Sequence, residues 1–113
     1  MTTLKILKAA HDLLAVPGTW IQCREALDKN GFSTLPDAED ATCWCALGAI
    51  RRVQGGTTPY AQVLLRLITS MPHKPKGDRL ADIVLDWNDQ PGRTQDEVLA
   101  LFDKAIAAEE SQQ

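Results

Sequence analysis

Two cysteines flank a tryptophan in the stretch CWCALGAI, residues 43–50, and raise the question of thiol chemistry. Closely spaced cysteines bind zinc or form a redox pair when their sulfurs converge on one point. The apolar pattern here predicts a helix, in which residues two apart lie ~200° apart around the axis. The two thiols would then point in different directions. We therefore expect structural cysteines, with Cys43 in a core stripe and Cys45 on a face of small residues.

A nucleophilic cysteine would also need a base, and a zinc site would need further ligands. The two histidines, His11 and His73, are the only candidate bases, and the sequence places neither beside a thiol. No second group of cysteine or histidine residues has ligand spacing. The sequence thus predicts no catalytic residue, no metal and no cofactor, with a catalytic thiol and a metal site as the alternatives.

Three carboxylates, Asp82, Asp86 and Asp89, follow one another at helical spacing and could bind a divalent cation. They also lie opposite the apolar stripe of the same predicted helix, at Leu80, Ile83, Val84 and Trp87. Amphipathic helices keep their charges on that side, so we interpret these acids as a solvated face.

Aromatic walls with a few polar groups are typical of small-molecule pockets. Residues of this kind occur at three places in the chain, and together they form a candidate binding site of Trp20, Arg24, Trp44, Cys45, Asn88 and Asp89. A rival interpretation makes Trp87-Asn88-Asp89 a structural corner between two helices. In that corner the short polar side chains bond to free backbone groups, and Arg93 pairs with Asp89.

Basic residues cluster in HKPKGDR, residues 73–79, although the net charge of the chain is −3. A negative chain argues against general nucleic-acid binding, since that affinity comes from many lysines and arginines neutralising phosphates. Nucleic-acid binding would require one shared face for a basic patch of Arg51, Arg52, Lys74, Lys76 and Arg79. A solvated basic loop is the favoured interpretation.

Apolar residues with a period of 3.6 predict five short helices. These cover approximately residues 4–14, 36–53, 58–71, 80–87 and 94–106. Pro17-Gly18 and Gly55-Gly56 stop the first two, and Thr57 or Thr58 before Pro59 starts the third. The run Thr94-Gln95-Asp96-Glu97 predicts a capping box at the start of the last.

Two local features refine this pattern. Alternating residues before Asn30-Gly31 predict a small β-hairpin near residues 20–35, because Asn and Gly tolerate the positive φ of such turns. Gly48 lies inside a predicted helix, where glycine costs ~1 kcal/mol relative to alanine. Its presence indicates the close approach of another backbone or of a tryptophan ring.

The length of 113 residues, with 44% apolar and 24% charged residues, predicts one ordinary globular domain. We expect a mainly α fold, a compact bundle of about five short helices with the small hairpin at its side. The single domain would cover residues 1–108, and the polar residues 109–113 would fray. The N-terminal stretch has neither a signal-peptide nor a membrane-span pattern. We expect a cytoplasmic protein whose cysteines remain thiols.

The segments TCWCALGAI and DWNDQPGRTQDEVLALFDKAI resemble a family of small helical proteins of unknown function from actinobacteria and their phages. The family pattern is Trp-Cys-Ala-x-Gly-Ala, then Trp-Asn-Asp, then Thr-x-x-Glu-Val. The matching residues are Trp44, Cys45, Ala46, Gly48, Ala49, Trp87, Asn88, Asp89, Thr94, Glu97 and Val98, and Trp20 and Gln22 also resemble the family. The resemblance implies no reaction, and phage occurrence implies an accessory role such as blocking a host protein.

The expected function is therefore a non-catalytic binding protein that contacts another protein. The alternative is a small-molecule or nucleotide-binding protein, or a small enzyme, with its pocket around the Trp-Cys helix and the Trp-Asn-Asp corner. Nucleic acid and membrane are not expected partners, and the sequence leaves the oligomeric state open.

Overall fold

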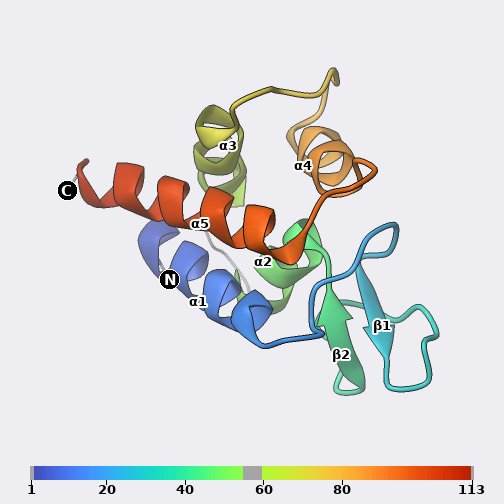
Figure 1. Ribbon diagram of the computed structural model, residues 1–113. Helices are drawn as coiled ribbons and strands as arrows, with labels where there is room; N and C mark the ends of the chain where they lie inside the picture. The colour runs from blue at the N-terminus through green and yellow to red at the C-terminus, as the bar shows by residue number, and fades with distance from the viewer. Residues whose placement is uncertain (1, 55–59, 113) are drawn as a thin grey trace.

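The computed structural model describes residues 2–54 and 60–112, and within these ranges the chain forms five helices and one two-stranded antiparallel sheet (Figure 1). The helices are α1 (Thr3–Ala15), α2 (Ala46–Gln54), α3 (Tyr60–Ser70), α4 (Leu80–Asn88) and α5 (Gln95–Glu110), and the strands are β1 (Ala26–Asp28) and β2 (Ala41–Trp44). The predicted mainly α bundle with one small hairpin is confirmed. The predicted signals at residues 55–59 lie outside the described residues.

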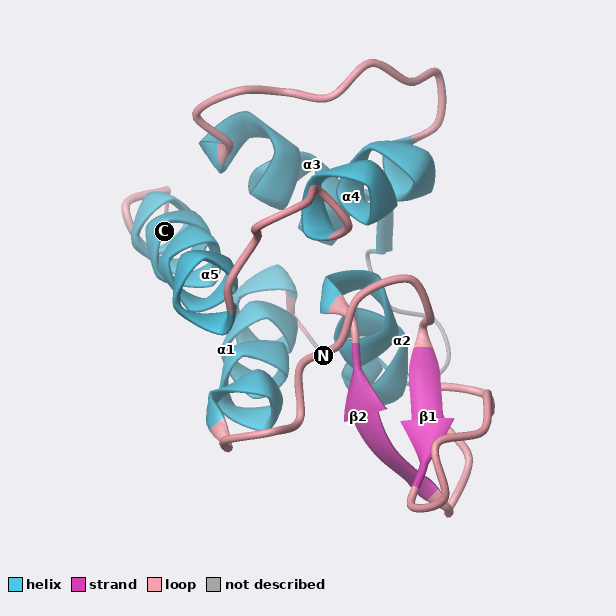
Figure 2. Ribbon diagram, turned by 45° about the vertical axis from the view of Figure 1, so that its right-hand side comes forward, coloured by secondary structure: helices cyan, strands magenta, loops and turns pink. Residues whose placement is uncertain are grey.

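The core lies where α1 contacts α2 and α5, and where α3 contacts α4 and α5. Figure 2 shows the two strands at one side of these helices, next to α2. The apolar stripes of the helices meet in the core and are removed from water, which supplies the main favourable term of folding. The largest fully buried side chains include Ile6, Leu7, Leu14, Leu47, Ile50, Leu64, Leu67 and Phe102.

Helix α5 begins with the predicted capping box. The Thr94 hydroxyl accepts from the Glu97 amide at 3.2 Å, and the Glu97 carboxylate accepts from the Thr94 amide at 2.9 Å. The helix continues to Glu110, beyond the range 94–106 predicted for it. Two ion pairs hold this last part, from Glu109 to Arg66 at 2.8 Å and from Glu110 to Lys8 at 3.4 Å.

The predicted start of the second helix near residue 36 is wrong, because α2 begins only at Ala46. The preceding residues form β2, in which Trp44 pairs with Ala26 and Cys43 pairs with Leu27. Trp44 also donates its amide hydrogen to the Thr19 carbonyl at 2.7 Å. These partners are distant in sequence, and their hydrogen bonds override the helical periodicity of the segment.

The hairpin is likewise longer than predicted. The expected tight turn is present, with Gly31 at φ +82° and the Asp28 amide donating to the Phe32 carbonyl at 2.9 Å. A single bridge joins Leu27 to Ser33 beyond this turn. The strand that completes the sheet, however, is β2, so the connection between the strands spans residues 29–40. We call this connection the β1–β2 loop.

Gly48 in α2 has the close neighbour that the sequence indicates. A Cβ atom at this position would lie 1.9 Å from the carbonyl oxygen of Glu25. The neighbour is therefore a backbone and not a tryptophan ring. Glycine at position 48 allows the segment before β1 to pack directly on α2.

Candidate functional site

Asn88, the last residue of α4, is fully buried and joins two distant segments to the end of this helix. Its Oδ1 accepts from the Trp20 indole Nε1 at 2.7 Å and from the Ala46 amide at 3.0 Å. Its Nδ2 donates to the Ile21 carbonyl at 3.1 Å and to Asp89 Oδ1 at 2.9 Å. A side-chain amide has two acceptor and two donor positions. All four are used within the chain.

Neighbouring residues extend this network along the segment before β1. Asp89 Oδ1 accepts from the Cys23 amide at 2.9 Å, and Gln22 Nε2 donates to the Asn88 carbonyl at 3.1 Å. Cys23 has a positive φ of 70°, a conformation that is uncommon outside glycine. The network therefore holds Cys23 in an unfavourable backbone conformation, beside the end of α4.

The three residues Trp87-Asn88-Asp89 thus form a structural corner, but most of its hydrogen bonds reach distant segments instead of the local turn. The predicted pairing of Arg93 with Asp89 is wrong. Arg93 Nε donates to the Trp87 carbonyl at 2.9 Å, and its guanidinium lies 3.8 Å from the centre of the Trp87 ring. This stack covers one face of the Trp87 ring, which is almost fully buried.

The burial of the two cysteines in CWCALGAI differs from the prediction, which placed Cys43 and not Cys45 in the core stripe. Cys45 is buried just before α2, where its Sγ accepts from the Gly48 amide at 3.3 Å. Burial raises the pKa of the Cys45 thiol to about 11, so this thiol stays neutral and is a weak nucleophile. Cys43 is only partly buried in β2, and its Sγ donates to the Gly18 carbonyl at 3.5 Å. The two thiols therefore have different partners, Gly18 for Cys43 and Gly48 for Cys45, and Cys43 lies in a strand instead of the predicted helix.

Trp44 and the arginines of α2 hold loops in place. The Trp44 indole Nε1 donates to the Pro36 carbonyl at 2.9 Å. Arg52 lies over the Trp44 ring at 5.4 Å and donates to the Ala38 carbonyl at 2.6 Å. Arg51 forms an ion pair with Glu25. Both guanidinium groups therefore already have partners within the chain.

The five residues of the predicted basic patch do not form one surface. Lys74, Lys76 and Arg79 lie on the loop between α3 and α4, at the top of Figure 1, whereas Arg51 and Arg52 lie on α2. These basic residues therefore lack the shared face that nucleic-acid binding would require.

Arg24 is the one candidate site residue that remains at an exposed position beside a hollow. It lines a space of about 340 Å³ together with Cys23, Ser33 and Asp89. Its guanidinium donates to the Cys23 carbonyl at 2.9 Å. The structure thus brings Trp20, Asn88 and Asp89 together as a bonded network. Cys45, whose Sγ accepts from the Gly48 amide, lies outside this network, as do the Trp44 ring and Arg24.

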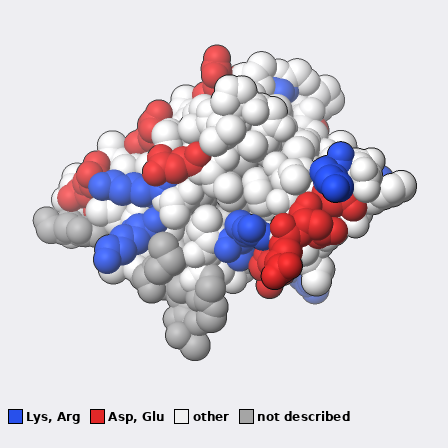
Figure 3. All heavy atoms as spheres, turned by 90° about the horizontal axis from the view of Figure 1, so that it is seen from below, with Lys and Arg blue, Asp and Glu red and all other residues white. Residues whose placement is uncertain are grey.

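The β1–β2 loop was not predicted as functional, yet it carries the two most exposed large apolar side chains of the described residues. Phe32 is 69% exposed and Leu35 is 71% exposed. The sequence signal that could have revealed them is two bulky apolar residues between turn-forming Asn-Gly and Pro-Asp pairs. The side of the molecule that holds the strands also carries a group of acidic side chains (Figure 3), and Asp37, Glu39 and Asp40 in this loop are exposed.

Neither a metal cluster nor a membrane span is found in the ranges 2–54 and 60–112. No three His, Cys, Asp or Glu side chains there are grouped to hold a metal ion. Asp82 and Asp86 are exposed, while Asp89 turns to the Cys23 amide. No helix of these ranges is long and apolar enough to cross a lipid bilayer.

The comparisons with curated proteins and with solved structures found no match to this chain. The sequence model of a family of unknown function, DUF6197, matches residues 1–108, which include every helix and both strands up to the last turn of α5. The chain therefore belongs to DUF6197, a family of unknown function.

Proposed function

We propose that this protein is a non-catalytic binding protein that acts through protein–protein contact, with the β1–β2 loop as its contact surface. The observation that carries the proposal is the exposure of Phe32 and Leu35, at 69% and 71%, on one short loop. Large aromatic and aliphatic side chains that insert into a partner's pocket supply most of the binding energy of many interfaces. Exposing two of them in water is otherwise unfavourable.

The loop is held in one shape by its own hydrogen bonds. Asp28 Oδ1 accepts from the Asn30 amide at 2.9 Å and from the Phe32 amide at 3.0 Å. Thr34 Oγ1 donates to Asp40 Oδ1 at 3.1 Å. A loop that is ordered before binding loses less conformational entropy on association. The two apolar side chains are therefore presented on a preorganised surface.

The charges of the loop indicate the chemistry of the partner. Asp37, Glu39 and Asp40 are exposed beside Leu35, and Lys29 is the one basic residue of the loop. Complementary charge around an apolar contact speeds association and excludes wrong partners. The expected partner is a protein with an apolar pocket rimmed by lysine and arginine.

A non-catalytic role agrees with the surroundings of the potential nucleophiles. Cys45 is buried with a raised pKa, His11 lies between Asp12 and Asp103, and His73 lies on the loop between α3 and α4. The hydrogen-bonding capacity of Asn88 is used within the chain, which disfavours the alternative of a ligand pocket at the Trp-Asn-Asp corner.

The proposal includes a cytoplasmic location, where the three cysteines would stay free. It also includes an accessory or inhibitory role toward a host protein, which is what the resemblance to proteins of actinobacteria and their phages implies.

The test is a comparison of matched variants in affinity capture followed by measurement with the purified partner. The F32S/L35S variant removes both exposed apolar side chains of the loop. The V16S/L65S variant removes two other exposed apolar side chains, from the end of α1 and from α3, and is the control. We expect a captured protein that binds the wild type and the control equally. Its affinity for F32S/L35S should fall roughly 30-fold or more, the loss typical of a hot spot.

Two results would overturn the proposal. One is a captured protein whose affinity is the same for F32S/L35S and for the wild type. The other is a wild-type homodimer that F32S/L35S dissociates in sedimentation experiments, since the loop would then bind a second copy of this chain.

A further inference from the structure

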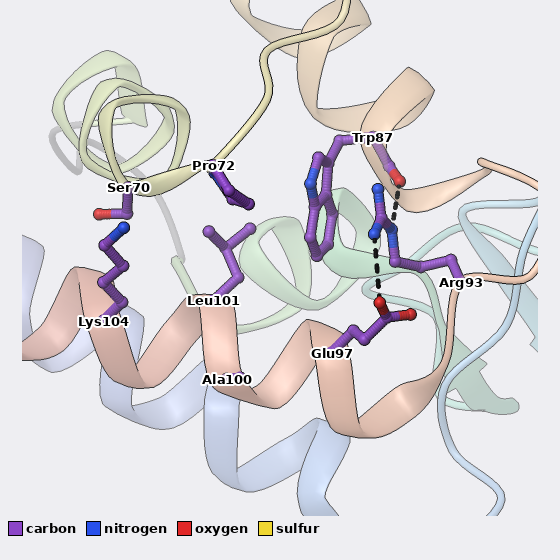
Figure 4. A pocket seen from close by; sticks show the side chains of 8 residues that line it. All are labelled: Ser70, Pro72, Trp87, Arg93, Glu97, Ala100, Leu101 and Lys104. Carbon is purple, nitrogen blue, oxygen red and sulfur yellow. Dashed lines mark hydrogen bonds and ion pairs between the residues drawn. The ribbon is translucent and has the colours of Figure 1, made fainter.

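The Arg93–Trp87 stack lines two hollows. One lies between the α3–α4 loop and α5 (Figure 4), and the other lies between the α3–α4 loop and the α4–α5 turn. Trp87 comes from the end of α4, and Arg93 from the turn that leads to α5. Both residues line both hollows. The two spaces are therefore adjacent, on a different part of the molecule from the β1–β2 loop.

The first hollow has apolar walls and a volume of about 280 Å³. Figure 4 shows Pro72 and Leu101 between Lys104 and Trp87, with Arg93 on the far side of the Trp87 ring. An apolar space with a flat aromatic side suits a planar apolar group. Lys104 adds a positive charge at one end.

The second hollow, of about 380 Å³, has a basic lining. His73 and Lys74 line it from the α3–α4 loop, and Arg93 lines it from the α4–α5 turn. No aspartate or glutamate lines this hollow in the described part of the chain. The first hollow has one acid, Glu97, whose carboxylate caps α5 and lies 3.7 Å from Arg93 Nη1.

Arg93 keeps donors for a ligand. Its Nε is bonded to the Trp87 carbonyl, but the 3.7 Å separation of Nη1 from Glu97 exceeds hydrogen-bond length. A guanidinium carries five N–H donors in a planar fork that matches phosphate and carboxylate oxygens. Stacking on Trp87 fixes the plane of this fork at the boundary of the two hollows.

We propose that the two hollows form one binding site for a small molecule with a flat apolar body and a single phosphate or carboxylate group. The apolar body would occupy the first hollow, beside Trp87 and Leu101. The anionic group would occupy the second, where Lys74 and Arg93 bind it. Positive charge gathered around a hollow in a chain of net charge −3 favours an anion at this place over the rest of the surface.

Fluorine NMR of protein labelled with 5-fluorotryptophan tests the site directly. The chain has three tryptophans, and the indole groups of Trp20 and Trp44 are bonded to Asn88 and Pro36, so their signals act as internal references. The probes are 1-naphthyl phosphate, 1-naphthoate, neutral 1-naphthalenemethanol and inorganic phosphate. We expect the first two to shift the Trp87 signal alone and to bind at least about fivefold more tightly than either of the others. The tighter of the two identifies the preferred anionic group.

Three exposed lysines provide the matched variants. K74Q should weaken binding of the tighter anion by roughly two- to fivefold, as expected for an exposed ionic contact, and raised salt should weaken it further. K104Q, at the end of the first hollow away from the anion, should weaken binding less than K74Q does. K5Q, at an exposed position on α1, should leave binding unchanged. A Trp87 signal unmoved by millimolar anion would overturn the proposal. Equal binding of the neutral probe or of inorganic phosphate, or unchanged affinity in K74Q, would also overturn it.

Discussion

The indole Nε1 of Trp20 donates a hydrogen bond of 2.7 Å to the buried Oδ1 of Asn88, 68 residues away in the sequence. The same oxygen accepts from the Ala46 amide at the start of α2. One side chain at the end of α4 therefore holds both the segment before β1 and the first turn of a neighbouring helix. These hydrogen bonds explain why Asn88, a polar residue, is fully buried in this small core.

Substitution of Asn88 by alanine should lower the free energy of unfolding by about 2–4 kcal/mol, because several buried backbone and indole groups would lose their partner. Urea denaturation followed by tryptophan fluorescence measures the change. Asn30→Ala, at an exposed position of the β1–β2 loop, is the control and should have little effect. If Asn88→Ala unfolds at the same urea concentration as the wild type, the network is not what stabilises this corner.

Gly48→Ala should destabilise the fold although alanine is the better helix former. The added Cβ would lie 1.9 Å from the Glu25 carbonyl oxygen, a backbone atom that moves only with its whole segment. We expect a loss of about 2–3 kcal/mol, measured by thermal or urea denaturation. Cys45→Ser should cost less, since a serine hydroxyl can accept from the Gly48 amide as an N-cap. Equal stability of Gly48→Ala and the wild type would contradict the close approach.

The raised pKa of Cys45 predicts a loss of stability at alkaline pH. Burial raises this pKa from its usual 9.0 to about 11. The unfolded chain therefore loses the thiol proton at a lower pH than the folded chain does. The contribution is fully present below pH 9.0 and is lost as the pH rises to about 11, by about 2–3 kcal/mol in total.

The measurement is the unfolding free energy of the wild type and of Cys45→Ser from pH 7 to pH 11. The difference between the two proteins isolates Cys45 from the other ionisable groups, which both proteins share. We expect the wild type to lose more stability than Cys45→Ser above pH 9.0. Parallel curves for the two proteins would show that the thiol has its ordinary pKa in the fold.

Arg52→Lys should loosen the β1–β2 loop while keeping the charge. Lysine loses the stacking of the guanidinium on Trp44 and cannot reach the Pro36 and Ala38 carbonyls in the same geometry. Hydrogen exchange at the Ala38 and Ala41 amides, which are bonded within this turn, should accelerate roughly five- to tenfold. Arg79→Lys, an exposed residue of the α3–α4 loop, is the control. Unchanged exchange in Arg52→Lys would mean that the loop keeps its shape without this contact.

The sequence by itself determined the helices and much of the core. Residues such as Leu64, Leu67, Val84 and Phe102 recur at helical spacing, and each is buried as its period predicts. The capping box of α5 is also local, because both partners lie within one turn. Glycine is unfavourable inside a helix, so the presence of Gly48 indicates a close neighbour. The sequence does not show which segment that neighbour belongs to.

Only the tertiary structure decided where β2 lies and what Asn88 does. Residues 41–44 fit a helical period, but pairing with β1 and with Thr19 satisfies their backbone groups better than an extension of α2 would. The sequence around Asn88 is typical of a local turn, whereas the hydrogen-bond partners of its side chain include the distant residues Trp20, Ile21 and Ala46. Helical periods and caps depend on residues within a turn or two, so the sequence displays them. Strand pairing and buried polar networks join segments that only the packing of the whole chain brings together.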